Sequence, residues 1–341
     1  MRLKSTWPSP CPEAFSHRGL LSKTVVRSDP RGGPWHHNAG RLPVASSFMS
    51  GIIEPILVTG ATGMVGTHVT HLLRSRGVEV VAHARRAAPG VDWVADLTDP
   101  QTFLNPMRFD VAAVIHCAAA IPARSSEFVR DNAVASATLA ASLSKAKSLK
   151  RIIHVSSVAV YERPPIGRWV IDEDAKTVNG DGTPGCYAAS KRAAERSLDA
   201  VGHDNPEVEI THLRASSIYG PGMVRTTLLP VLVARALQHE PIHLQGPRPY
   251  FQNFIHVADV AELASALLQQ DRAPAVINAF SDCTYEIAPL AQTIRTVLGS
   301  SSQVIDESYS AEGPEPVFLN GVAKKLHPAF RSLPDHLADA S

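Results

Sequence analysis

The chain has 341 residues, of which 44% are apolar, which suits one large α/β domain or two modest ones with a sizeable core. Its 33 lysines and arginines nearly balance 32 acidic residues, which argues against binding to nucleic acid or to an anionic membrane. No apolar run is long enough to span a bilayer.

The first 50 residues differ from the rest, because they are rich in proline, arginine, serine and glycine and show no apolar period. An arginine-rich transit segment is one interpretation. We favour the other, an extension preceding a functional start at Met49, and we expect residues 1–50 to be disordered or non-native.

From Glu54 onwards, short continuous apolar runs alternate with helical patterns, which indicates βαβ units and a parallel sheet buried on both faces. We predict a Rossmann-type doubly wound sheet in residues 51–222, to which 250–282 return. Residues 223–341 then form mainly a small substrate-binding domain. The predicted strands are 56–58, 78–82, 111–117 and 151–155, and the predicted helices are 66–77 and 127–146.

The segment TGATGMVG, Thr59 to Gly66, follows the first predicted strand and opens the first helix. A pyrophosphate must approach bare backbone amides at a helix N-terminus, where side chains on the turn would block it. Glycines at positions 60, 63 and 66 meet that need, and the strand–turn–helix context supports a dinucleotide site over an ordinary tight turn.

The adenosine ribose offers a test of which dinucleotide binds. NAD-selective sites usually place a carboxylate about 20 residues beyond the glycines, whereas Arg85 and Arg86 stand here. Because a guanidinium suits a 2′-phosphate, we expect NADP rather than NAD. Further on, Asp96 has two open interpretations, an acceptor for the adenine amino group or the start of the helix that follows Thr98.

Tyr187 and Lys191 are spaced four apart in YAASK, which places both side chains on one face of a helix. A lysine ammonium beside the phenol would lower the pKa of Tyr187, and such a phenol can exchange a proton while a hydride moves. Ser157 should lie just past the carboxyl end of the strand before it, where open α/β sheets bind ligands. Ser156 is the neighbour that competes for this assignment.

Taken together, six segments in this order resemble the extended short-chain dehydrogenase/reductase family, in particular its NAD-dependent epimerase/dehydratase branch. They cover most of the chain after Met49. The segments are TGATGMVG, VIHCAAA, SSVAVY, YAASK, IYGPG and FIHVADVAE.

The resemblance implies that Tyr187 is the catalytic acid/base, Lys191 its partner and Ser157 the catalytic serine. Asn132 matches a helix asparagine whose backbone supports a water-linked proton relay. The cofactor-binding residues implied by the glycine motif and the resemblance are Gly60, Thr62, Gly63, Met64, Val65, Gly66, Arg85, Arg86, Asp96, Leu97, Ala118, Ala119, Tyr187 and Lys191.

The substrate candidates are Ser157, Tyr219, Arg248 and His256. Tyr219 could instead be a packed turn aromatic, and His256 a buried histidine that donates to the backbone. Many nucleotide-sugar enzymes of the family carry Arg-Asp where Gln252 and Asn253 stand here, which weakens the case for a substrate diphosphate there. Arg248 is the candidate replacement.

We therefore predict an NAD(P)-dependent oxidoreductase or epimerase acting on a hydroxyl or keto group of a nucleotide-sugar-like substrate. The alternatives are an NADPH-dependent ketone or aldehyde reductase and a non-catalytic NADP(H)-binding regulator. Val158 occupies the position where a dehydratase usually has an acid, so dehydration is disfavoured. The resemblance also implies a homodimer.

The sequence contains four cysteines without a CxxC pair or a matching histidine cluster. It therefore predicts no metal site and no disulfide framework, and incidental thiols fit a reducing, cytoplasmic location. These cysteines are Cys11, Cys117, Cys186 and Cys283.

Overall fold

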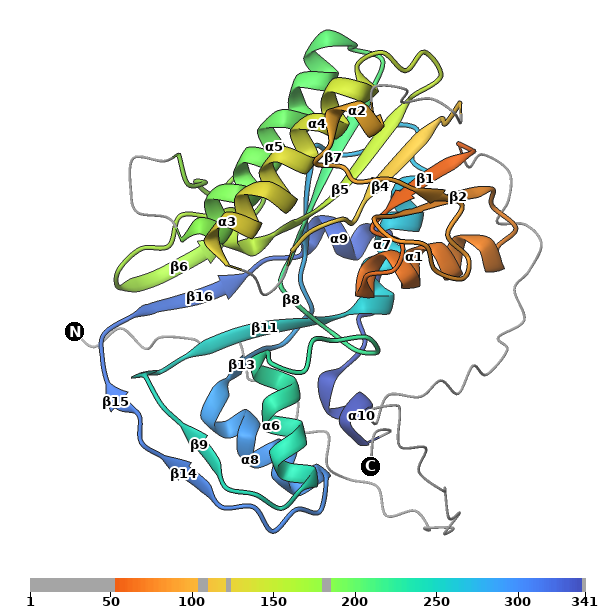
Figure 1. Ribbon diagram of the computed structural model, residues 1–341. Coiled ribbons are helices and arrows are strands. Elements are labelled where there is room, and N and C mark those ends of the chain that lie inside the picture. Colours follow the sequence, from red (N-terminus) through yellow and green to blue (C-terminus); the bar gives the residue numbers. More distant parts are fainter. Residues whose placement is uncertain (1–52, 104–109, 121–123, 180–184, 339–341) are drawn as a thin grey trace.

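The computed structural model describes residues 53–103, 110–120, 124–179 and 185–338 (Figure 1). The predicted N-terminal extension and the start at Met49 lie outside these ranges. Among the residues that are described, no helix has both the length and the apolar character needed to cross a membrane.

A seven-stranded parallel sheet forms the centre of the larger part, in the order β12-β7-β5-β4-β1-β2-β3. The chain leaves β1 in one direction to β2 and later crosses to β4 on its other side, so the strand order reverses at β1. This confirms the predicted doubly wound sheet. Its strands are β1 (Ile56–Thr59), β2 (Val80–Ala84), β3 (Trp93–Val94), β4 (Ala113–His116), β5 (Arg151–Ser157), β7 (Glu209–Ala215) and β12 (Val276–Ala279).

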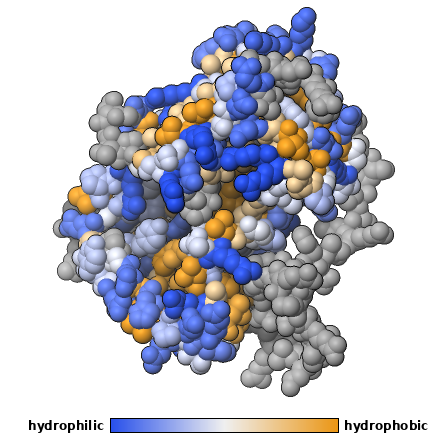
Figure 2. Space-filling view, in the orientation of Figure 1, coloured by the Kyte–Doolittle hydropathy of each residue, from blue (hydrophilic) through white to orange (hydrophobic). Residues whose placement is uncertain are grey.

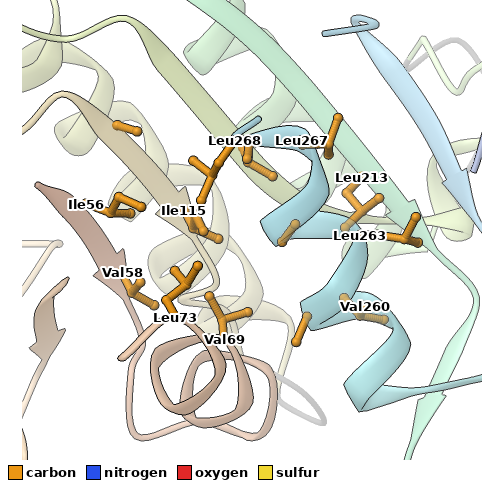
Figure 3. Close-up of a cluster of buried hydrophobic side chains, with 14 of the residues drawn as sticks. Ile56, Val58, Val69, Leu73, Ile115, Leu213, Val260, Leu263, Leu267 and Leu268 are labelled. Atoms are coloured by element: carbon orange, nitrogen blue, oxygen red, sulfur yellow. The ribbon is translucent and has the colours of Figure 1, made fainter. Parts of the chain in front are cut away.

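Helices cover both faces of this sheet (Figure 1). Because alternate side chains of a strand point to opposite faces, Ile56 and Val58 pack in one core while Leu57 packs in the other. The first core lies against α1 (Met64–Ser75), α7 (Val257–Leu267) and α9 (Gly321–Leu326), and Figure 3 shows its side chains between β1, α1 and α7. The second lies against α4 (Ala135–Leu143) and α5 (Cys186–Asp204).

The predicted helix over 127–146 is divided into three consecutive pieces. These are α3 (Ser125–Phe128), a π-helical segment η1 (Val129–Val134) and α4. A π-helical turn is rare and is frequently found at functional sites. Between β3 and β4 lies the short helix α2 (Pro100–Phe103), and η2 (Val158–Val160) follows β5.

The smaller part has its own core, in which α6 (Leu228–Leu237) and α8 (Ile287–Val297) pack with α10 (Leu333–Ala338). In Figure 2 hydrophobic residues gather over the lower part of the molecule, the region where Figure 1 places these helices. A three-stranded sheet joins the two parts, formed by β8 (Ser217–Tyr219), β11 (Phe251–His256) and β13 (Thr284–Glu286).

Three two-stranded pairings complete the fold. They are β6 (Gly167–Ile171) with β16 (Pro314–Phe318), β9 (Ile242–Leu244) with β14 (Val304–Asp306), and β10 (Pro247–Arg248) with β15 (Tyr309–Ser310). The C-terminal segment also returns to the larger part, since Ala323 of α9 is fully buried in the core beneath the large sheet.

Candidate functional site

The glycine turn between β1 and α1 leaves no room for side chains. Gly60 has a φ of +66°, and a Cβ added to it would lie 2.7 Å from the Ala118 Cα. A Cβ on Gly66 would lie 2.1 Å from the Gly60 carbonyl oxygen. The turn therefore requires glycine at both positions, because β1, β4 and α1 approach one another through bare backbone.

The first turn of α1 faces the ends of β1 and β4 without a capping side chain. Gly63 is the N-cap residue and makes no side-chain cap hydrogen bond, and Thr62 and Ala119 nearby are exposed. The amides at the start of α1, those of Met64 and Val65 included, have no partner within the helix and point toward its N-terminus. Such an end attracts a phosphate.

Arg85 lies directly after β2 and is ion-paired. Its guanidinium is 2.9 Å from the carboxylate of Asp131 in η1 and 3.9 Å from that of Asp96. Asp96 also accepts hydrogen bonds from the amide and hydroxyl of Thr98, and these contacts hold the pKa of Asp96 below its ordinary value. Arg86 is exposed. The end of β2 thus carries two guanidinium groups, and that of Arg85 is held in place by Asp131, a residue that the sequence analysis did not select.

Two details of this region differ from the sequence expectations. The side chain of Leu97 is buried in the core against α4, which leaves only its backbone to contact a cofactor. Asp96 does not begin the helix, because it is Asp99 that accepts from the Gln101 amide at the start of α2.

Tyr187 lies in the first turn of α5, and Ser157 at the end of β5 lies close enough to its phenol to lower the phenol pKa. Its ring also packs on that of Phe128, with 5.3 Å between centroids. Ser156 points elsewhere and donates to Glu195 at 2.6 Å, so the structure distinguishes the two serines. Ser157 is the one that meets the phenol.

Lys191 lies one helical turn beyond Tyr187 and is 3% exposed. Its Nζ donates to the Val155 carbonyl at 2.7 Å and lies 3.2 Å from His154 Nε2. Burial lowers the pKa of Lys191 to about 8. Burial also raises the pKa of Tyr187, against the opposing effect of Ser157. The expected lowering of the Tyr187 pKa is therefore wrong in direction for this state, because desolvation of the phenol is the largest effect.

Asn132 sits in the π-helical segment and joins two parts of the site. Its side-chain oxygen accepts from the Ala120 amide at 2.8 Å, and its amide nitrogen donates to Ser190 at 3.0 Å. Ser190 in turn donates to the Tyr187 carbonyl at 2.8 Å. Asn132 thereby fixes the start of α5 against the segment that follows β4.

The predicted substrate residues of the smaller part lie in different surroundings. Tyr219 is fully buried and its hydroxyl donates to the Arg331 carbonyl at 3.4 Å, so it is a packed core aromatic. His256 is 6% exposed, and its Nδ1 accepts from the Ala258 amide at the start of α7. It accepts from the backbone instead of donating to it. Arg248 is partly exposed and ion-paired with Asp306.

Asp259 is fully buried in the first turn of α7 and binds the C-terminal segment. It accepts from the Arg331 backbone amide at 2.8 Å, from the Arg331 guanidinium and from His327 Nε2 at 3.0 Å. His256, not Asp259, caps α7.

The cysteines fit the expectation only in part. Cys117 and Cys186 are free thiols, and burial raises the pKa of Cys117 to about 12, which makes it unreactive. At Cys11 and Cys283 the expectation stays a prediction, because Cys11 lies outside the described residues.

Because several histidines are buried in the neutral form, we expect the free energy of unfolding to fall in acid. Burial lowers the pKa of His83 to about 4 and those of His116 and His256 to about 3. In the unfolded chain these side chains take up a proton below their ordinary pKa, so stability falls as the pH drops through that value. We expect a loss of roughly 2 kcal/mol for each of the three between pH 7 and pH 5, measured by urea unfolding.

The exposed His203 provides the control, because His203→Gln should leave this pH dependence unchanged. A free energy of unfolding that stays constant from pH 7 to pH 5 would show that these histidines are not held neutral.

Sequence reasoning missed three residues of this site. They are Asp131, which pairs with Arg85, His154, which contacts Lys191, and Glu195, which accepts from Ser156. Glu195 had a visible signal, since it lies four residues after Lys191 on the same helix face. Asp131 and His154 acquire their partners only through the sheet register and the packing of η1.

Comparison with known proteins gives one family. Residues 56–279 match the family model described as NAD dependent epimerase/dehydratase family. A dTDP-4-dehydro-6-deoxy-D-allose reductase from Streptomyces bikiniensis is 26% identical over 280 residues, which are 73% of this chain and 82% of the relative. A UDP-glucose 4-epimerase from Vibrio cholerae is 29% identical over 182 residues, 50% of this chain and only 53% of that protein.

Solved structures show the same architecture. The structure of MoeE5 in complex with UDP-glucose and NAD is 25% identical, with a TM-score of 0.67, over 84% of this chain and 97% of that one. The UDP-glucuronic acid 4-epimerase from Bacillus cereus in complex with NAD shares the fold at 21% identity, with a TM-score of 0.68, over 83% of this chain and 96% of that one. The chain therefore belongs to the NAD-dependent epimerase/dehydratase family of enzymes.

Proposed function

We propose that the protein transfers a hydride between bound NAD(P) and a hydroxyl or keto carbon of a nucleotide sugar, with Tyr187 as the acid/base. The observation that carries this proposal is the placement of Tyr187 and the buried Lys191 one helical turn apart on α5, with Ser157 at the end of β5 close enough to the phenol to lower its pKa. The bare glycine turn at residues 60–66 provides the backbone that a dinucleotide pyrophosphate needs. When bound, the nicotinamide supplies the hydride acceptor or donor.

Each residue of the set has a separate role. Ser157 orients the reacting oxygen of the substrate. Tyr187 takes the substrate proton as the phenolate during oxidation and returns it as the phenol during reduction. Lys191 supplies a positive charge behind the phenol, and its pKa of about 8 keeps most of that charge at neutral pH. Asn132 holds the start of α5, which carries Tyr187, against the segment after β4.

The substrate class rests on the relatives. The relatives described above are named for dTDP- or UDP-linked sugars, and one solved structure is a complex with UDP-glucose. Gln252 contacts Ser217 through its side-chain amide and so provides no cation for a diphosphate. Arg248 is the candidate cation, and a diphosphate would have to compete with Asp306 and Glu286 for it.

The experiment is a panel of UDP- and dTDP-linked sugars and 4-keto sugars incubated with NAD(H) or NADP(H), with turnover followed by nicotinamide absorbance and by product mass. Native mass spectrometry of the protein as purified separates the reaction types. A retained NAD(H) indicates an epimerase cycle in which the hydride returns, whereas loosely held NADPH indicates a reductase. Val158 beside Ser157 disfavours dehydration. The absence of any turnover across the panel would overturn the nucleotide-sugar assignment.

For the cofactor, we favour NADP over NAD. No carboxylate follows β2 directly, and the two guanidinium groups of Arg85 and Arg86 stand there, one of them fixed by Asp131. A guanidinium bound to a 2′-phosphate contributes a charge-assisted hydrogen bond that NAD lacks.

Replacing Arg85 and Arg86 together with alanine should raise the Kd for NADPH by about tenfold or more, while the Kd for NADH changes by less than about twofold. Fluorescence titration measures both. Alanine at both exposed arginines Arg163 and Arg168, which also removes two positive charges, serves as the charge-matched control. An equal loss for both dinucleotides, or a wild-type preference for NADH, would contradict the NADP assignment.

We also propose a homodimer and a cytoplasmic location. The dimer follows from the family resemblance, which places the interface on helices near Tyr187, and light scattering of the purified protein would test it. The location rests on the near-neutral charge balance and the free thiols of Cys117 and Cys186. Fractionation of cells that produce the protein would test it.

A further inference from the structure

Three histidines lie in one row across the large sheet. His116 of β4, His154 of β5 and His212 of β7 are partners in register, so their side chains share the face covered by α4 and α5. All three are buried, and the rings of His116 and His154, and of His154 and His212, are each 5.4 Å apart between centroids. The glycine motif, the serines and the tyrosine account for none of them.

Hydrogen bonds link two of these histidines to Lys191 and to the surface. Lys191 Nζ lies 3.2 Å from His154 Nε2, and His154 Nδ1 lies 3.2 Å from His212 Nδ1. His212 Nε2 lies 2.8 Å from an oxygen of Asp199. The Asp199 side chain is 43% exposed, so this series of contacts runs from the buried ammonium to solvent.

The two ends of the series determine the tautomers. A lysine ammonium can only donate, so His154 Nε2 accepts and its proton resides on Nδ1. An ionised aspartate can only accept, so His212 Nε2 donates and His212 Nδ1 accepts. The lysine end and the aspartate end therefore require the same hydrogen bond between the rings, in which His154 Nδ1–H donates to His212 Nδ1.

We propose that His154, His212 and Asp199 form a relay that moves protons between Lys191 and solvent through the body of the protein. In the outward direction the N–H bond of Lys191 breaks and an N–H bond forms at His154 Nε2. The His154 Nδ1 proton passes to His212 Nδ1, the His212 Nε2 proton passes to Asp199, and the carboxyl group releases it to water. One proton leaves, both rings stay neutral, and the inward direction uses the same atoms in reverse.

The surroundings favour concerted transfer. Burial and the nearby Lys191, His212, His116 and Arg214 hold the pKa of His154 well below its ordinary value, which disfavours a resting imidazolium. His116 is not part of the relay, because its ring nitrogens contact Thr59 and Ser136.

The use of this relay in catalysis rests on the proposed function, since oxidation of a hydroxyl releases one proton per hydride and reduction consumes one. The relay itself does not depend on it. His154, His212 and Asp199 are therefore positioning and relay residues that act through Lys191, and they can be tested without a substrate.

The test is nuclear magnetic resonance of the full-length protein with isotope-labelled histidine. Long-range proton–nitrogen spectra should show His154 protonated on Nδ1 and His212 protonated on Nε2. The exchange rate of the His154 Nδ1 proton with water should fall at least about tenfold in Asp199→Asn, because an amide oxygen accepts the hydrogen bond but does not take the proton. Asp204→Asn, an exposed change on the same helix, is the matched control and should leave the rate unchanged.

Backbone amide exchange in β5 and β7 separates a blocked relay from a loosened fold, because the relay predicts no change there in either variant. The opposite tautomer at His154 or His212 would overturn the proposal. An unchanged His154 exchange rate in Asp199→Asn would also overturn it, and the hydrogen bonds would then be structural only. Failure of the nucleotide-sugar panel would leave these results unaffected.

Discussion

Tyr187→Phe is expected to lower kcat about a thousandfold with a nucleotide-sugar substrate, while the Kd for the dinucleotide stays within about twofold. The hydroxyl is the only group removed, and the effect of Ser157 on the pKa of Tyr187 places this hydroxyl near the end of β5, where the reacting oxygen should lie. The phenylalanine ring keeps the packing against Phe128, whose centroid lies 5.3 Å from that of Tyr187. Steady-state kinetics and fluorescence titration measure the two quantities.

A matched control comes from Tyr309, which is 62% exposed on β15. Tyr309→Phe removes the same hydroxyl group and should leave kcat unchanged. If Tyr187→Phe kept wild-type turnover, the phenol would not be the acid/base, and the proposed mechanism would be wrong even if the dinucleotide bound tightly.

The second large effect concerns stability. Glu195 of α5 is fully buried and accepts hydrogen bonds from Arg214 at 2.9 and 3.0 Å, from Arg192 at 2.9 Å and from Ser156 at 2.6 Å. Glu195→Gln keeps the shape but leaves the Arg214 guanidinium buried without its counter-charge. We expect the free energy of unfolding to fall by about 3–5 kcal/mol, measured by urea unfolding.

Glu207→Gln is the control, because Glu207 is exposed shortly after the same helix and should change stability by less than about 0.5 kcal/mol. A loss below about 1 kcal/mol for Glu195→Gln would show that water or a rearranged neighbour compensates Arg214. The ion pair would then not be what anchors α5 to β5 and β7.

The fold was predictable because its signals are local. Continuous apolar runs at β1, β4 and β5 indicate strands buried on both faces, and the glycine turn identifies the first βα unit. The predicted need for glycine holds at Gly60 and Gly66 because the neighbouring backbone leaves no space for a Cβ there. A steric constraint of this kind can be recognised from the residue type alone.

The electrostatic details were not predictable, since they depend on burial and on partners far apart in the sequence. Spacing alone suggested a lowered pKa for Tyr187, whereas desolvation raises it. Asp259 lies in the first turn of α7, and its carboxylate binds Arg331, 72 residues later, which no local pattern indicates. A π-helical segment likewise depends on how η1 packs against α5, which no apolar period reveals.

The most direct measurement of the central claim follows a deuterium atom. Reduced dinucleotide deuterated at the transferable position of its nicotinamide is mixed with the protein and a 4-keto nucleotide sugar, and the sugar is analysed by mass spectrometry. The account predicts that the label appears on the sugar carbon that bore the carbonyl oxygen, at a rate that collapses in Tyr187→Phe. Label that stays on the dinucleotide throughout the substrate panel, or that moves equally fast without the phenol, would contradict it.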